Sequence, residues 1–397
     1  MAKQEEDTLA SGSVAAYAQA VHKRYGAGSI MTADSVSRVA VPRISTGIWV
    51  LDKALGGGLP IGRYSQVYGA KSTGKSSLFM RAVANAQRMC GNCYRTVELV
   101  PGEVEAIDPN TGEVYMAESM VVGDCQCGKP RNFTIAWVDQ EGSWESNWAA
   151  KMGVYEERLL LSRPVFAEEA VDIMDGALHS GVDVVVLDSI AQMSPAAEVK
   201  DSAAKFSDHP GMHARIMGNA VRKWTAAMQM KFKQSLAEGS DFRVPTVLLV
   251  NQTRMKIGVK FGSPETTPGG NAVGFATSVE IRTAPGEYKV DDKDMETYYV
   301  ELGVKVNKNK VGAARQGGKY RICTMDHGLY RKGQIIDYND VLYHSLRCGV
   351  VEQLSNKKYR WAGDEYLGKK RLMEHWASNP EDYNKAKMLT LQVALQE

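Results

Sequence analysis

A glycine-rich segment with one lysine has the spacing of a phosphate-binding loop. Residues 69–76 are Gly-Ala-Lys-Ser-Thr-Gly-Lys-Ser, which matches the pattern G-x-x-x-x-G-K-[ST] in full. Glycines let the backbone curl so that its N–H groups face phosphate oxygens, and a following helix adds its positive end. In such a loop Lys75 reaches the β- and γ-phosphates, and the Ser76 hydroxyl ligates Mg²⁺. The predicted phosphate-loop residues are Gly69, Ala70, Lys71, Ser72, Thr73, Gly74, Lys75, Ser76 and Ser77.

Carboxylates that follow two apolar runs could complete a hydrolytic site. Asp188 ends the run Val184–Leu187, and it is the predicted second Mg²⁺-binding group. Asp139 and Glu141 follow the run Thr134–Val138. Hydrolysis needs a group that orients the attacking water, and we predict Glu141 for this role. Asp139 is the alternative in the same turn, and periodicity alone does not separate the two.

Four cysteines fall in two close pairs, which predicts a metal site. Cys90 and Cys93 have the C-x-x-C spacing, whereas Cys125 and Cys127 form a tighter C-x-C pair after 31 intervening residues. Four thiolates would hold Zn²⁺ in a closed, tetrahedral structural site. Four independent thiols or a redox pair are the alternatives. No histidine stands near either pair, so catalytic zinc is not predicted.

The segment between the cysteine pairs is acidic. Residues 94–124 contain seven acidic residues and one basic residue, Arg95. The stretch Glu103–Ala117 predicts two strands about a Pro-Asn-Thr-Gly turn. Because the acidic charge disfavours direct contact with nucleic acid, we expect a partner protein at this insert.

Composition excludes several classes of protein. The 397 residues hold 48 Lys and Arg against 46 Asp and Glu, a net charge of +2, so the chain is neither a polybasic nucleic-acid coat nor an acidic chaperone-like chain. The sequence has no apolar run of about 18 residues and no signal-peptide core, which predicts no membrane contact and a cytoplasmic location.

The hydrophobic pattern predicts an α/β fold with a mainly parallel central sheet flanked by helices. Thr134–Val138, Val182–Leu187 and Val244–Val250 are continuous apolar runs, typical of strands buried on both faces. Later strands alternate, which favours antiparallel additions at the sheet edge; these are Ser278–Arg282, Tyr298–Val306 and Tyr320–Cys323.

Four regions are expected along the chain. Residues 1–42 form an N-terminal arm with a helix over Val14–Tyr25, and residues 43–88 with 134–335 form the core. Residues 89–133 form an inserted module with the four cysteines. Residues 336–397 form a small α+β domain, with helices predicted at 340–348, 369–377 and 383–395.

Three runs beside the phosphate loop carry a family resemblance. Lys23–Met31, Ser45–Leu55 and above all Asn251–Ala272 resemble the bacterial RecA recombinase family, and the likeness extends from about residue 14 to about residue 380. The resemblance implies a RecA-like P-loop ATPase core that uses ATP and Mg²⁺. It also implies a helical filament of this chain on single-stranded DNA, which pairs that strand with homologous double-stranded DNA in recombination and repair.

The resemblance also implies roles for single residues. Glu141 resembles the family's catalytic glutamate, Gln252 its γ-phosphate sensor and Trp148 an aromatic near the adenine. Lys308 and Lys310 resemble a pair that reaches the ATP of the neighbouring subunit. Without the resemblance, two lysines on an expected edge strand would be interpreted as solvated.

Two segments could contact DNA. Arg254, Lys256 and Lys260 lie beside Phe261 among glycines, so cations could neutralise phosphates while an apolar wedge separates bases. A flexible surface loop is the alternative. A second loop is expected at Lys200–Met212, with Arg215, Arg222 and Lys223 on the helix that follows. The predicted DNA-binding residues are Arg215, Arg222, Arg254, Lys256, Phe261, Gly269, Gly270 and Asn271.

Two other functions stay open. One is a RecA-fold DNA motor, a helicase or branch-migration ATPase, which the N-terminal arm and the Asn251–Ala272 run oppose. The other is an ATP switch without catalysis, which Glu141 and Gln252 oppose. The chain also departs from the family, because Gly274 replaces an expected lysine beside Phe275 and Pro210 replaces a methionine.

Overall fold

A nine-stranded sheet forms the centre of the computed structural model, which describes residues 13–26, 28–31, 41–200, 211–237, 244–255, 265–290 and 297–396. The strands, in spatial order, are β15 (Ile335–Ile336), β14 (Gly317–Cys323), β13 (Thr297–Asn309), β12 (Val279–Val290), β3 (Tyr64–Gly69), β9 (Thr246–Gln252), β8 (Val184–Asp188), β6 (Ile135–Asp139) and β7 (Leu159–Ser162).

The sheet is parallel from β12 to β7 and antiparallel from β12 to β15. Every residue of β6 and β8 is buried, because helices cover both faces there. A strand buried on both faces needs apolar side chains at every position, which explains the continuous runs in the sequence. The predicted parallel core with antiparallel additions at one side is confirmed, except that Ser278–Arg282, expected among the antiparallel additions, lies in β12, which pairs parallel with β3.

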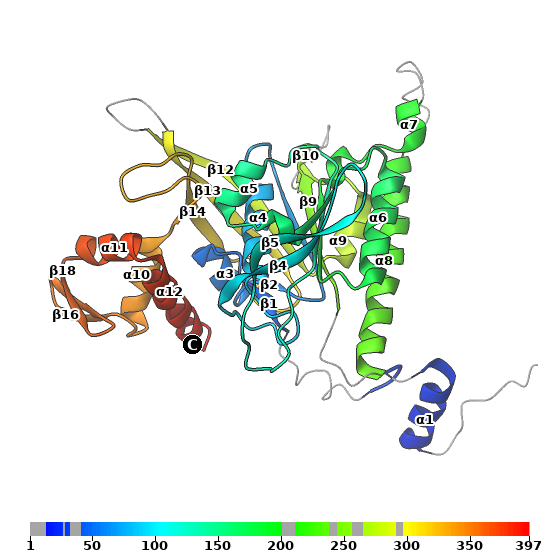
Figure 1. The fold of residues 1–397 in the computed structure, drawn as a ribbon, viewed down its shortest axis with the longest axis horizontal. Coiled ribbons are helices and arrows are strands. Elements are labelled where there is room, and N and C mark those ends of the chain that lie inside the picture. Colours follow the sequence, from blue (N-terminus) through cyan, green and yellow to red (C-terminus); the bar gives the residue numbers. More distant parts are fainter. Residues whose placement is uncertain are drawn as a thin grey trace, which may run out of the picture.

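Alternate residues of each central strand enter different cores. On one face α3 (Trp49–Leu55), α4 (Lys75–Ala86) and α5 (Ser146–Met152) pack with side chains such as Trp137. On the other face α6 (Ala167–Ser180), α8 (Met212–Ala237) and α9 (Gly270–Ala276) pack around Trp224. Figure 1 shows α6 and α8 side by side along one side of the sheet.

The insert forms a two-stranded hairpin of β4 (Leu99–Ile107) and β5 (Val114–Val122), as predicted. Its turn is closed by Asp108, whose carboxylate accepts the backbone N–H groups of Asn110 and Thr111. The hairpin lies against the short helix η1 (Glu156–Arg158), where Arg158 donates to the Met120 carbonyl at 2.7 Å.

The last elements have a core of their own. They are α10 (Tyr338–Arg347), β16 (Glu352–Ser355), β17 (Lys358–Trp361), β18 (Asp364–Leu367), α11 (Lys369–Ser378) and α12 (Pro380–Ala394). Trp361, Leu372 and Trp376 are buried among them. Asp337 fixes this core to α3, because its carboxylate accepts the Trp49 N–H at 3.1 Å and the Lys387 ammonium at 2.5 Å.

Short elements connect these parts. The helix α1 (Val14–Tyr25) has its predicted bounds, and Ser13 caps it by accepting the Ala16 N–H. The others are β1 (Arg43–Ile44), β2 (Leu59–Pro60), η2 (Ile190–Gln192), α7 (Ala196–Lys200), β10 (Arg254–Met255) and β11 (Glu265–Thr266). Within the described ranges, no helix is both long enough and apolar enough to cross a membrane.

Candidate functional site

The phosphate loop connects the end of β3 to the start of α4. Gly74 caps α4 with φ +74°, and a Cβ there would lie 2.7 Å from Leu302 Cδ1. A Cβ on Gly69 would lie 2.3 Å from Thr283 Oγ1. Both positions therefore require glycine, which is the structural reason for the two glycines of the sequence pattern. The loop opens directly onto the N-terminus of a 12-residue helix, where an anion is favoured.

Lys75 is 9% exposed and points into its own loop. Its ammonium donates to the Ala70 carbonyl at 2.7 Å. Burial lowers the pKa of Lys75, while the charges of Glu141 and Asp188 raise it. A phosphate could therefore replace the carbonyl as acceptor without moving the backbone.

Asp188 ends β8 with a carboxylate that is 1% exposed. Burial raises its pKa to about 7; the Ser76 hydroxyl lowers it by a hydrogen bond, and the charges of Glu141 and Asp139 raise it. Its Oδ1 atom is buried and has no hydrogen-bond partner in the described structure. A hydroxyl and a carboxylate with a free oxygen, side by side, fit a Mg²⁺ ion that carries ordered water.

The structure distinguishes Asp139 from Glu141. Asp139 is buried, and its carboxylate accepts the N–H groups of Ser143 and Trp144, each at 3.0 Å. Glu141 is exposed, and its carboxylate accepts the Ser189 hydroxyl at 3.3 Å. Asp139 thus holds the turn, whereas the Glu141 carboxylate stays accessible next to Asp188.

The end of β9 connects the phosphate loop to a predicted DNA loop. Gln252 is the register partner of Gly69, and the next residue, Thr253, donates its N–H to the Gly69 carbonyl at 3.2 Å. β10 follows at once and pairs with β11. Arg254 is exposed on β10, while the predicted contacts Lys256 and Phe261, with Lys260, lie outside the described residues.

Glu265 fixes the far end of this segment to the central sheet. Its carboxylate accepts the Arg282 guanidinium, with an Nε–Oε2 distance of 2.8 Å. Arg282 belongs to β12 and is the register partner of Tyr68 in β3. Both ends of the segment are therefore attached within one residue of the point where the phosphate loop begins.

Four further predicted DNA-binding residues, Arg215, Gly269, Gly270 and Asn271, lie at the N-terminal ends of α8 and α9, while Arg222 lies further along α8. Gly269 caps α9 with φ +96°, and Asn271 is exposed in its first turn. A Cβ on Gly270 would lie 3.2 Å from the Ala214 Cβ, so the two helix ends are neighbours. Arg215 is exposed on the first turns of α8.

Two cations of α8 have partners on helices. Arg222 is exposed and donates to the Asn219 amide oxygen one turn earlier. Lys223 forms ion pairs with Asp172 and Asp175 of α6, at 3.9 and 3.7 Å. Residues 201–210 hold most of the expected loop between α7 and α8, and they lie outside the described residues.

Trp148 lies on α5 beside the phosphate-loop helix. Its indole N–H donates to the Ser77 hydroxyl at 2.9 Å, and the ring is half-buried. The Lys332 ammonium lies 6.0 Å from the ring centroid. An aromatic surface thus lies next to Ser77, the residue after Ser76 of the phosphate loop. The adenine contact that the resemblance implied stays a prediction.

Lys308 and Lys310 hold the last turn of α9. They donate to the carbonyls of Gly274 and Phe275, at 2.6 and 2.9 Å. The expectation of an edge strand here was wrong, because β13 lies between β12 and β14. Alternation along β13 indicated partial exposure but not which strand would pair beyond it. The lysines lie beside Phe275, whose side chain is 76% exposed.

The four predicted cysteines come together. Their Sγ atoms all lie within 4.8 Å of one another, with Cys90–Cys127 at 3.7 Å and Cys93–Cys125 at 3.3 Å. Burial alone would raise the pKa of Cys90, but backbone hydrogen bonds from Asn92, Cys93 and Arg131 lower it to about 6. Four converging sulfurs, one of them stabilised as a thiolate, fit the donor set of a closed zinc site.

Arg131 connects this cluster to the central sheet, which sequence patterns did not indicate. Its guanidinium pairs with both oxygens of Asp183, at 2.7 and 2.8 Å, and donates to the Gly91 carbonyl at 2.7 Å. Asp183 also accepts the Thr134 N–H just before β6. The partners are 52 residues apart, and nothing local marks either of them.

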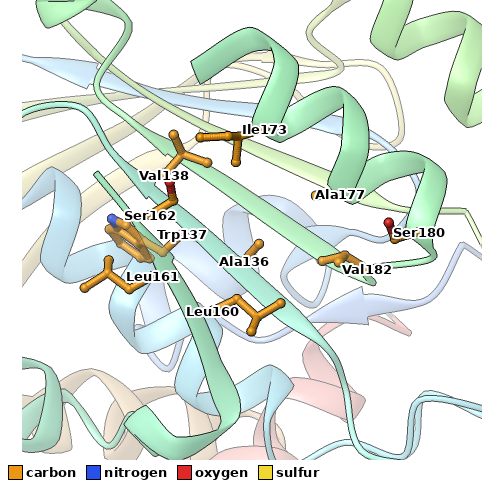
Figure 2. A pocket seen from close by; sticks show the side chains of 10 residues that line it. All are labelled: Ala136, Trp137, Val138, Leu160, Leu161, Ser162, Ile173, Ala177, Ser180 and Val182. Atoms are coloured by element: carbon orange, nitrogen blue, oxygen red, sulfur yellow. The ribbon is translucent and has the colours of Figure 1, made fainter. Parts of the chain in front are cut away.

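An apolar pocket of about 190 Å³ lies elsewhere, between β6, β7 and α6. Figure 2 shows Leu160, Leu161 and Ile173 around it. None of its lining residues is titratable, and none belongs to the phosphate loop.

Comparisons with known proteins agree with these features. The family model described as the RecA N-terminal domain matches residues 13–113 and 110–328. Protein RecA of Pseudomonas putida is 34% identical over 365 residues, which cover 91% of this chain and 84% of the relative. Protein RecA of Pseudomonas syringae pv. syringae is 34% identical over 366 residues, with the same coverage. The chain belongs to the RecA family and has the role of a RecA recombinase.

Proposed function

We propose that this chain hydrolyses ATP as a helical filament on single-stranded DNA and pairs that strand with homologous duplex DNA. The proposal rests on β9, which connects the phosphate loop to the predicted DNA-binding segment. Gln252 stands beside Gly69 of the phosphate loop, and the base of the Arg254–Glu265 segment is hydrogen-bonded to the same glycine. A group that contacts the γ-phosphate would therefore move the DNA loop directly.

Binding of the triphosphate is assigned to the loop Gly69–Ser76 and to Lys75. The Lys75 ammonium exchanges the Ala70 carbonyl for phosphate oxygens, and the α4 N–H groups donate to them. Ser76 and Asp188 would hold Mg²⁺, which neutralises phosphate charge when bound. Trp148 would border the adenine, fixed by its bond to Ser77.

Glu141 is assigned as the group that orients the attacking water. Its carboxylate is exposed, lies beside Asp188 and is held by the Ser189 hydroxyl at 3.3 Å. Asp139 positions this turn and is not assigned to the water, because both of its oxygens already accept backbone N–H groups. Gln252 would detect the γ-phosphate, and hydrolysis would release that contact.

Lys308 and Lys310 are assigned to the ATP of a neighbouring protomer. In the single chain they occupy carbonyls of α9, so each could exchange that acceptor for a phosphate across the interface. Such an exchange would make ATP part of the contact between protomers. It would also free the last turn of α9, whose first turn carries the DNA-binding residues Gly270 and Asn271.

The four-cysteine cluster is assigned to one structural Zn²⁺ ion. Cys90 follows the phosphate-loop helix and Cys127 precedes β6, so the metal would join the far ends of two catalytic elements. The acidic hairpin beyond the cluster is assigned to a protein partner. We assign the whole assembly to the cytoplasm.

ATP hydrolysis and strand exchange test the proposal together. We expect single-stranded DNA to stimulate hydrolysis and the filament to exchange homologous strands, with electron microscopy to show the helix. Lys75→Ala should lose both activities while its circular dichroism spectrum stays unchanged. Hydrolysis without DNA stimulation, or duplex unwinding without pairing of homologous strands, would contradict the proposal and favour a motor.

A further inference from the structure

The outer half of the β4–β5 hairpin exposes apolar side chains that the chain itself does not cover. Ile107, Val114 and Met116 are 52%, 63% and 56% exposed. Ile107 pairs with Val114, and Glu105 pairs with Met116, so the three apolar residues share one face of the hairpin. Figure 1 shows the hairpin at the surface of the central body.

Glutamates border this apolar face. Glu105 lies on it, and the pair Glu103 and Glu118 follows two residues further from the turn. We call the six residues Glu103, Glu105, Ile107, Val114, Met116 and Glu118 the hairpin face. Residues 96–124 contain seven acidic residues and no lysine or arginine, so no charge of the hairpin compensates them.

The hairpin also has open edges. Among the strands that the structure describes, β4 and β5 pair only with each other. A two-stranded sheet with an apolar face gains stability when a third strand joins it. The inner half is held firmly by Arg158 on Met120 and by the Asn132 amide oxygen, which accepts the Val122 N–H at 2.8 Å. These hydrogen bonds fix the inner half of the hairpin, and the outer half extends from it.

We propose that the hairpin face docks an extended segment of a partner protein in which every second residue, the set on one face of a strand, runs from apolar residues to lysine or arginine. Added as a strand beside β5, such a segment would place its apolar side chains beside Val114 and Met116 and its cations beside Glu118 and its pair Glu103. The proposal deepens the protein partner named under the proposed function, and it rests on that assignment.

Charge argues against the other occupants. Nucleic acid would bring phosphates to a face with three carboxylates and no cation. A second hairpin of this chain would bring the same carboxylates against one another, and like charges that face each other across strands are unfavourable. A basic segment alone offers both the apolar and the charged complement.

Fluorescence anisotropy with a labelled nine-residue peptide, Thr-Val-Thr-Val-Thr-Lys-Thr-Lys-Thr, tests the proposal on the zinc-loaded full chain. The control peptide Thr-Val-Lys-Val-Lys-Thr-Thr-Thr-Thr has the same composition but points its lysines to the other face of the strand. We expect the first peptide to bind about tenfold more tightly, since only it carries valine and lysine on one face. Equal affinity of the two peptides would overturn the proposal.

Two variants and a control assign the binding to the hairpin face. Val114→Ser with Met116→Ser keeps every charge and should weaken binding about tenfold, because apolar burial is lost. Glu105→Gln with Glu118→Gln should weaken binding and reduce its dependence on salt, because Glu103 alone stays charged on the face. Tyr115→Ser, on the opposite face of the hairpin, is the matched control and should bind like the wild type. Wild-type affinity of both face variants would overturn the proposal.

Direct binding measurements separate the remaining occupants from the one proposed. Binding of a labelled DNA oligonucleotide that Val114→Ser with Met116→Ser weakens, or dimerisation that Met116→Ser abolishes, would each contradict a basic protein segment. ATP hydrolysis is measured on the same samples. Peptide binding without DNA-stimulated hydrolysis would contradict the proposed recombinase function but support the docking surface, and the reverse result would do the opposite.

Discussion

The phosphate site and the four-cysteine insert are built in opposite ways. Lys75, Asp139 and Asp188 are all buried at the ends of strands and a helix that the nine-stranded sheet holds in place. Between residues 91 and 132 of the insert, in contrast, no apolar side chain is buried. A segment without a core needs another source of order. Packing therefore positions the residues of the phosphate site, whereas a few hydrogen bonds and ion pairs position the insert.

The largest expected effect is on catalysis at the packed site. Glu141→Gln should lower kcat by about 10³-fold, because an amide does not accept the proton of the attacking water. Nucleotide affinity should stay close to that of the wild type, since the side chain is exposed and does not form the loop. Single-turnover hydrolysis and nucleotide titration measure the two quantities.

Asp139→Asn is the matched control for that assignment. Its carboxylate holds two backbone N–H groups in a buried turn, so the amide should cost about 1–3 kcal/mol of stability. If kcat falls further in Asp139→Asn than in Glu141→Gln, and the Asp139→Asn protein has normal stability, then Asp139 and not Glu141 orients the attacking water.

Removal of zinc should have the next largest effect. It should lower the stability of the chain and leave kcat nearly unchanged. Elemental analysis should find about one zinc per chain, the stoichiometry of a Cys₄ site. Chelation, or Cys93→Ser, should lower the free energy of unfolding by about 3 kcal/mol, which thermal unfolding would detect as a lower Tm. Because Glu141 and Lys75 are held by the sheet, kcat of the folded fraction should change less than about threefold. No bound zinc, or an unchanged Tm after chelation, would refute a stabilising zinc ion at the four cysteines.

The buried Asp188 at the packed site predicts a pH dependence of stability. Its pKa is raised to about 7 by burial, so the metal-free folded chain holds a proton that the unfolded chain has already lost. Stability of the metal-free chain should therefore fall by about 4 kcal/mol as pH rises from about 4 to about 7, and Asp188→Asn should remove this contribution.

The rate of Mg²⁺-dependent hydrolysis should have the opposite pH dependence. The ion binds the carboxylate and not the acid, so Mg²⁺-dependent ATP hydrolysis should rise as pH passes upward through about 7. Rate profiles from pH 5.5 to 8.5 at several Mg²⁺ concentrations measure this. An apparent pKa that does not move downward when Mg²⁺ is raised would contradict the role of Asp188.

The smallest expected effect concerns one attachment of the insert. Arg158 is 7% exposed and donates to the Met120 carbonyl, while its Nε and Nη2 atoms have no partner in the described structure. Arg158→Met should keep the packing and cost about 1 kcal/mol or less. Hydrogen exchange should accelerate across β4 and β5 and stay unchanged in β6 and β8. Equal acceleration in both regions would show that the two regions unfold as one unit.

The elements of the packed site and the hairpin turn could be predicted because their sequence signals are local. The Gly69–Ser76 spacing, the run before Asp188 and the hairpin turn all depend on neighbours in the chain. Periodicity did not separate Asp139 from Glu141, because their difference depends on which side chain the turn N–H groups reach. The pairing of β13 on both sides was missed for a similar reason, because alternation does not reveal the next strand.

The attachments of the insert could not be predicted from sequence. Arg131 meets Asp183 over 52 residues, and Arg158 meets the Met120 carbonyl over 38. A single arginine in a sequence does not indicate which distant residue it will contact. The helix α6 was also not predicted, although its apolar residues have helical spacing and face the sheet, as its buried side chains show.

Affinity for single-stranded DNA, measured with and without a non-hydrolysable ATP analogue, tests the central claim most directly. Because Gln252 and the DNA segment share one attachment at Gly69, we predict that the analogue tightens binding by about tenfold or more in the wild type. Gln252→Ala should bind the nucleotide and lose most of that gain. Identical DNA affinity of the wild type with and without the analogue would contradict the account.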